Sequence, residues 1–107
     1  MAKRNNMLFD RAEITCIYLD GSNKMKGAPK KACLRYNDIQ SVSIKPCRER
    51  KGLKVFESER ILIRVAKLPR PIEFYKLKEE PFFDDYKAGL RLFCRSHRIK
   101  LYDEVED

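Results

Sequence analysis

The stretch EPFFDDYKAGLRLFCRSH, residues 80–97, decides the fold. Its apolar side chains recur at spacings of three and four residues, which places them on one stripe of an α-helix. Asp84 and Asp85 near the start, and arginines near the end, have the signs that the helix dipole favours. Gly89 costs about 1 kcal/mol relative to alanine inside a helix, and its lack of a side chain would let a strand approach closely. The stripe, which requires a large apolar partner, consists of Phe82, Tyr86, Leu90, Phe93 and His97.

The chain before this helix alternates apolar and polar side chains in short runs, which is typical of strands. Pro46 should end the third run, because proline cannot donate to a ladder, and a charged loop should then follow over residues 46–52. Residues 7–10 are the candidate for a seventh strand, whereas residues 99–102 are expected to extend as a tail. We expect six strands, over residues 11–19, 31–36, 39–45, 53–56, 60–66 and 72–78.

Strands followed by one amphipathic helix predict an α+β fold. We expect six or seven antiparallel strands in a bent meander that is closed by one C-terminal helix. The whole chain, residues 1–107, should form one domain with an ordered core over residues 7–102. The acidic end, residues 103–107, is expected to be disordered.

The composition excludes several classes of protein. No apolar run approaches the ~20 residues that a membrane span needs, and the basic start lacks the apolar segment of a signal peptide, so we expect a cytoplasmic protein. The four cysteines form no CxxC pair, and reduced, buried thiols are their expected state. A zinc site that combines them with His97 is an alternative, against which the absence of short ligand spacings argues.

Positive charge is concentrated in the middle of the chain. The net charge is +8, but residues 21–70 carry 14 Lys and Arg against 4 Asp and Glu. In a meander alternate loops share one end, so three basic loops should form one basic rim, which would attract anions. Cations in loops also serve solubility alone, and the sequence leaves both interpretations open. The candidate anion-binding residues are Lys24, Lys26, Lys30, Lys31, Arg48, Arg50, Lys51, Lys67 and Arg70.

One local motif resembles a known family. The stretch LRYNDIQSVSI, residues 34–44, is similar to the turn between the second and third strands of bacterial pleckstrin-homology-like (PH-like) domains. The shared features are Tyr36, the pair Asp38-Ile39 and the pair Ser41-Val42. The resemblance implies a PH-like barrel of curved strands closed by the helix, with a binding role. The chain has no tryptophan and lacks the full basic motif of phosphoinositide binders, so no ligand residue is carried over from the family.

No catalytic motif is present in the sequence. There is one histidine, no Ser or Cys has a recognisable base partner, and the glycines form no phosphate-binding loop. We therefore expect a non-enzymatic binding module without a cofactor. Its partner would be a protein or an anionic membrane surface, met at the basic rim or in a groove between the fifth strand and the helix. The alternative is a basic nucleic-acid-binding protein, in which Tyr36 and Tyr75 could stack on bases.

Overall fold

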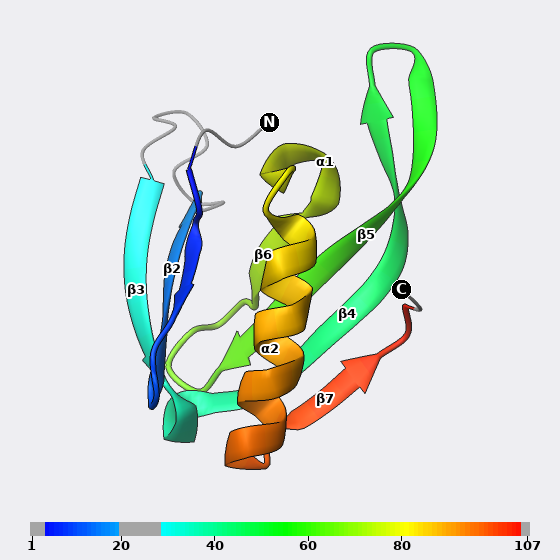
Figure 1. Ribbon diagram of the computed structural model, residues 1–107. Coiled ribbons are helices and arrows are strands. Elements are labelled where there is room, and N and C mark those ends of the chain that lie inside the picture. The colour runs from blue at the N-terminus through cyan, green and yellow to red at the C-terminus, as the bar shows by residue number, and fades with distance from the viewer. Residues whose placement is uncertain (1–3, 20–28, 106–107) are drawn as a thin grey trace.

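The computed structural model describes residues 4–19 and 29–105. In these residues the fold is α+β, with seven strands in two sheets and one main helix (Figure 1). The first sheet, sheet A, has the order β1-β2-β3, with bounds Met7–Phe9, Glu13–Leu19 and Pro29–Arg35. The second, sheet B, has the order β6-β5-β4-β7, with bounds Ile72–Tyr75, Lys54–Val65, Ile39–Lys51 and Lys100–Asp103. The helical elements are the 3-10 turn η2 (Tyr36–Asp38), α1 (Lys76–Glu79) and α2 (Phe83–His97).

Helix α2 is the centre of the core, as its stripe predicts. It packs against β1, β4 and β7, and it lies in front of sheet B with sheet A beside it (Figure 1). Burial of each of its aromatic side chains contributes about 1.5–3 kcal/mol of favourable transfer free energy, before the cost of ordering the chain. The alternation expected in the sequence is confirmed on the inner face of sheet B, where the buried residues are Val42, Ile44, Ile61, Ile63, Ile72 and Phe74. From α2 the core receives Phe83, Tyr86, Leu90, Phe93 and Cys94.

The chain after α2 is not a tail. It forms β7, which pairs in parallel with β4 through register partners such as Val42 and Leu101. The start of the acidic end is ordered, contrary to the expectation. Arg91 Nε donates to Asp103 over 2.7 Å, and the Glu104 N–H donates to the Ile44 carbonyl over 2.8 Å. The two sheets do not close into a barrel, and α2 runs along sheet B instead of closing one end (Figure 1).

The prediction that Pro46 ends a strand is wrong. Pro46 lies inside β4, opposite Glu59 of β5. The expected loop 46–52, the expected strand 53–56 and residues 57–59, which separate it from the next expected strand, are all parts of one long hairpin. The Ile44 carbonyl points toward the chain after β7, where it accepts from Glu104. Pro46, two residues on, has its nitrogen on the same side, where β7 has already ended. Its missing N–H therefore removes no ladder bond.

The far half of this hairpin extends beyond the rest of sheet B as an arm (Figure 1). We call residues 46–59 the β4–β5 arm. Its strands are joined by a turn at Gly52 and Leu53, and Gly52 adopts a φ of 64°, in the left-handed region that glycine tolerates best. No helix in the described part of the chain is long and apolar enough to cross a membrane.

Candidate anion-binding surface

The structure separates the cations that were expected to form one rim. The expected fourth and fifth strands are the single strand β5, so each later loop lies at the end opposite to the one expected. Lys67 and Arg70, between β5 and β6, therefore lie at the other end of sheet B from Arg48, Arg50 and Lys51 (Figure 1). Of the remaining candidates, Lys30 and Lys31 lie at the start of β3 in sheet A, and Lys24 and Lys26 lie outside the described residues.

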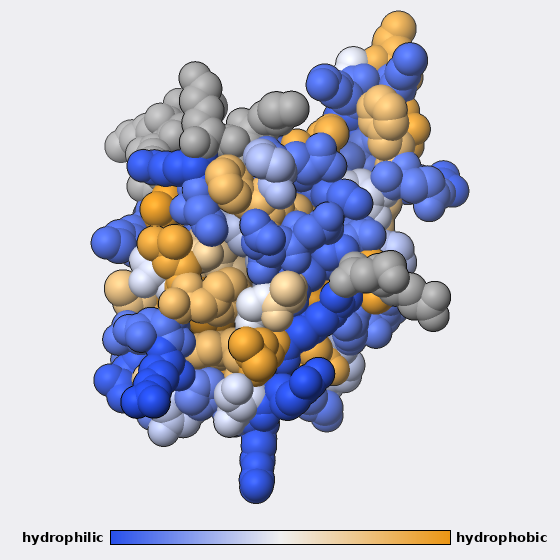
Figure 2. Space-filling view, viewed as in Figure 1, coloured by the Kyte–Doolittle hydropathy of each residue, from blue (hydrophilic) through white to orange (hydrophobic). Residues whose placement is uncertain are grey.

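The end of the β4–β5 arm combines cations with exposed apolar side chains. We call residues 50–56 the arm tip. Arg50, Lys51 and Lys54 are exposed there, and no acidic residue occurs within the tip. Leu53 is 103% exposed, and Val55 and Phe56 are 54% and 41% exposed. Figure 2 shows this projection as hydrophobic patches among hydrophilic ones.

The carboxylates of the arm lie nearer to its base and have partners. Glu49 accepts hydrogen bonds from Ser58 Oγ and from the Leu77 N–H, the latter over 3.0 Å. Glu59 pairs with Lys87 of α2 at 2.7 Å, and exposed Glu57 lies 3.9 Å from Arg48. The arm tip therefore has a net positive charge, although Glu49 and Glu57 adjoin it on β4 and β5, and this excess of cations favours anions.

A second basic surface covers the side of sheet B that faces away from α2. Residues directly opposite each other in neighbouring strands share a face, so the register places Ser41, Arg64 and Lys100 in one row. None of the residues on this side is buried. We call it the outer face, and it consists of Ser41, Ser43, Lys45, Arg60, Leu62, Arg64, Glu73, Tyr75, Lys100 and Tyr102.

Four of the ten outer-face residues are cations and one is an anion. Arg60 lies 3.9 Å from Glu73, and Lys45 lies 3.9 Å from Glu104, which follows β7. Lys100 Nζ lies 5.4 Å from the centroid of the Tyr102 ring, which is 45% exposed. The sequence indicated Tyr75 as a stacking residue but gave no reason to select Tyr102, because residues 99–102 were expected to be a tail.

The second tyrosine named from the sequence has a different role. Tyr36 stacks on His97, with ring centroids 4.5 Å apart and planes 11° apart. The Nε2 atom of His97 lies 2.6 Å from the Arg11 carbonyl oxygen, within hydrogen-bonding distance. His97 thus joins the end of α2 to the loop before β2, which is a structural role. In the described residues no three His, Cys, Asp or Glu side chains gather as a metal site would require.

The thiols differ in exposure. Cys16 and Cys94 are buried, as expected, whereas Cys33 is exposed and Cys47 is half-buried. Burial raises the pKa of Cys16 to about 12, with a smaller contribution from Cys33, and burial raises the pKa of Cys94 to about 11. Neither buried thiol is a nucleophile near neutral pH, because the thiolate is the reactive form.

Two polar groups lie at the inner side of α2. Lys87 is 2% exposed and pairs with Glu59 and with Asp84, the latter at 3.3 Å. The Tyr86 hydroxyl donates to Glu79 over 3.0 Å and accepts from the Asn6 N–H over 2.8 Å. These bonds connect α2 to β5, α1 and the N-terminal segment. Sequence reasoning missed Lys87, since Glu59 lies 28 residues away.

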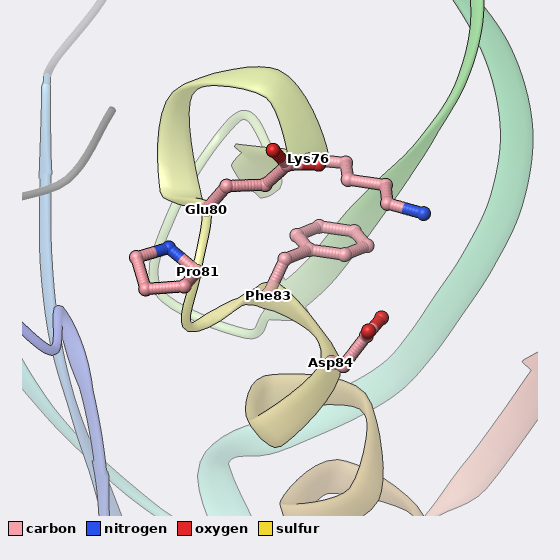
Figure 3. A pocket seen from close by; sticks show the side chains of 5 residues that line it. All are labelled: Lys76, Glu80, Pro81, Phe83 and Asp84. Carbon is pink, nitrogen blue, oxygen red and sulfur yellow. The ribbon is translucent and has the colours of Figure 1, made fainter.

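The Lys87–Glu59 pair joins α2 to β5 in the region where a groove between the fifth strand and the helix was expected. One of the hollows in the described part of the chain, of about 350 Å³, lies where α1 meets α2 (Figure 3). Figure 3 shows the Phe83 ring between Lys76 and Asp84, with Glu80 and Pro81 beside it. Its two carboxylates and one ammonium give no excess of positive charge, so this hollow is not part of the basic surface.

Comparison of the chain with models of protein families, with curated proteins and with solved structures gave no match.

Proposed function

We propose that this chain is a non-enzymatic binding module that meets an anionic partner with its β4–β5 arm. The observation that carries the proposal is the arm tip, where Leu53 is wholly exposed between basic residues. Covering an exposed apolar side chain stabilises a complex by about 25 cal/mol for each Å² of apolar surface that is removed from water. The flanking cations would bring an anionic partner to the same place and speed the encounter.

Two kinds of partner have the required chemistry, an anionic membrane surface and a protein with an acidic rim around an apolar pocket. Both would accept the apolar side chains of the tip while they neutralise Arg50, Lys51 and Lys54. The resemblance of residues 34–44 to PH-like domains supports a binding role. We propose that this relationship is distant, with an open pair of sheets in place of the family's barrel.

The state of the reactive side chains supports a role without catalysis. The only histidine packs on Tyr36 and meets a backbone carbonyl, and burial holds the pKa values of Cys16 and Cys94 above their usual range. The most polar buried cluster, around Lys87, is internally paired. These groups stabilise the fold. We therefore propose that the arm, and not a reactive side chain, contacts the partner.

The proposal is tested by retention on heparin, a polyanion, with two variants of equal net charge. Lys51→Glu/Lys54→Glu reverses two cations of the arm tip, and Lys67→Glu/Arg70→Glu reverses two cations at the opposite end of sheet B. We expect the first variant to lose retention and the second to elute near the wild-type protein. Equal shifts for both variants would mean that only net charge matters, and would overturn the proposal.

A further inference from the structure

We propose that the outer face of sheet B binds a single strand of nucleic acid. This inference rests on the proposed function, in which the protein meets an anionic partner with its arm, and it adds a third chemical class to the membrane surface and the acidic protein named above. It also extends the contact surface from the arm onto the body of the protein. Three features of the outer face support this inference: the short serine side chains beside Tyr102, the order of charged and aromatic rows, and the continuity with the arm.

The two central strands of the outer face differ in the length of their side chains. Strand β4 contributes Ser41 and Ser43, whose side chains are short, and β5 contributes Arg60, Leu62 and Arg64. The tyrosines stand on the edge strands, with exposed Tyr102 on β7 and half-buried Tyr75 on β6. A sheet with an exposed aromatic ring beside short side chains can stack unpaired bases, as the sheets of several RNA-binding folds do.

The charged residues lie on both sides of the Tyr102 row. The register places Tyr102, Ser43 and Leu62 in one row across β7, β4 and β5. The row on one side of it holds Lys100 and Arg64, and the row on the other side holds Lys45 and Arg60. Rows on one face are two residues apart, which is about 6.6–6.8 Å along a strand. A base stacked on Tyr102 would thus have cations for its phosphates on both sides.

The same face continues onto the arm. Every second residue of β5 lies on the same side of the sheet, so Arg60, Ser58, Phe56 and Lys54 share this face. Lys51 lies opposite Lys54 in the register of β4 and β5. Phe56 is 41% exposed. Glu49, which lies opposite Phe56, is also on this side, and its carboxylate accepts from Ser58 Oγ and from the Leu77 N–H. A strand that passes Glu49 would reach a further exposed ring and two further cations on the same side of the sheet.

A single strand fits the outer face better than a duplex or a bilayer does. Bases of a duplex are stacked on each other and present no free face to Tyr102, and the four-stranded body of sheet B is wider than the two-stranded ribbon that a major groove admits. A bilayer requires apolar side chains that insert, and among the ten outer-face residues Leu62 alone is aliphatic. Positive charge with separated aromatic rings is the arrangement expected for a single strand.

Fluorescence anisotropy of a labelled oligo(dT) of about 20 nucleotides tests the inference, with a duplex of the same length as competitor. The matched variants are Tyr102→Ala on the outer face and Tyr36→Ala on the η2 turn, since these rings are 45% and 39% exposed. We expect Tyr102→Ala to weaken binding roughly fivefold or more, and Tyr36→Ala to change it less than twofold. Raising salt from about 50 to 200 mM should weaken binding steeply.

Three outcomes would overturn the inference: no binding of the oligonucleotide, equal binding of the duplex, or equal effects of the two tyrosine variants. Heparin retention separates these failures from failure of the proposed function, because Tyr102→Ala should leave retention unchanged while Lys51→Glu/Lys54→Glu abolishes it. If the arm retains the protein on heparin or on anionic lipid vesicles but the oligonucleotide does not bind, the proposed function stands and the single-strand inference falls.

Discussion

Phe9 of β1 lies directly over Gly89 of α2, so closely that a Cβ atom at Gly89 would lie 2.3 Å from Phe9 Cε2. This relationship confirms the expectation that Gly89 allows a strand to approach the helix. It also explains why a residue with poor helix propensity occupies the middle of the central helix.

Gly89→Ala should destabilise the protein although alanine is the better helix former, because the new methyl group displaces the Phe9 ring. In a Phe9→Ala background the same change should stabilise by about 1 kcal/mol, the intrinsic helix preference. Urea unfolding of the four members of this double-mutant cycle measures both effects. A single variant Gly89→Ala as stable as the wild-type protein would show that the ring moves aside at no cost.

Phe93→Ala should lower the free energy of unfolding by about 3–5 kcal/mol. Phe93 is 6% exposed and packs near Phe9 and His97. Leu92 is the matched control, because it is the preceding residue of the same helix and is 63% exposed. Leu92→Ala should cost less than about 0.5 kcal/mol. Thermal and urea unfolding of both variants check the prediction, and similar costs would contradict the observed orientation of α2.

Glu59→Ala should destabilise by about 3 kcal/mol or more, because it removes the carboxylate closest to the buried ammonium of Lys87, while the other carboxylate, Asp84, is largely exposed. Lys87→Met combined with Glu59→Leu should cost much less, since apolar groups then replace both charges. Urea unfolding compares the variants. A double variant that is at least as unstable as Glu59→Ala would indicate that the pair contributes through its geometry and not through its charge.

Stability should fall as the pH rises above about 9. The pKa of Cys16 in the folded protein, about 12, lies above its ordinary value of 9.0, so its stabilisation is complete below pH 9 and is lost between pH 9 and 12. Cys94 behaves in the same way up to about pH 11, and burial also raises the pKa of Tyr86. Urea midpoints from pH 7 to 11 measure the decline, which Cys94→Ala should make shallower. A flat profile would refute it.

Leu53→Asp should leave folding unchanged, because the side chain contacts no part of the core and is wholly exposed. If the partner of the arm is an anionic membrane surface, this variant should float poorly with vesicles that contain anionic lipid. Leu92→Asp is the control, because it introduces the same negative charge at an exposed leucine of α2. Flotation of wild-type protein and both variants to the same extent would exclude insertion of the arm tip.

The sequence determined the local structure of this protein. The spacing of aromatic residues predicted α2, and alternation predicted which side chains of residues 39–45, 60–66 and 72–75 face the core, since both periods follow from the geometry of a single element. The expected strand 72–78 ends at Tyr75, because residues 76–79 form α1. The position of Gly89 likewise indicated a close contact. These features depend on neighbours within a few residues.

Tertiary structure decided where the candidate site lies. Whether Pro46 breaks a ladder depends on which strand lies beside its nitrogen, and that side of β4 is open because β7 has ended. Because β4 and β5 continue through the residues that were expected to form loops, Lys67 and Arg70 lie at the end of sheet B opposite to Arg50 and Lys51. The outer face requires the parallel pairing of β7 with β4, between residues about 60 positions apart. Such contacts depend on the packing of the whole chain, and periodicity within one segment carries no information about them.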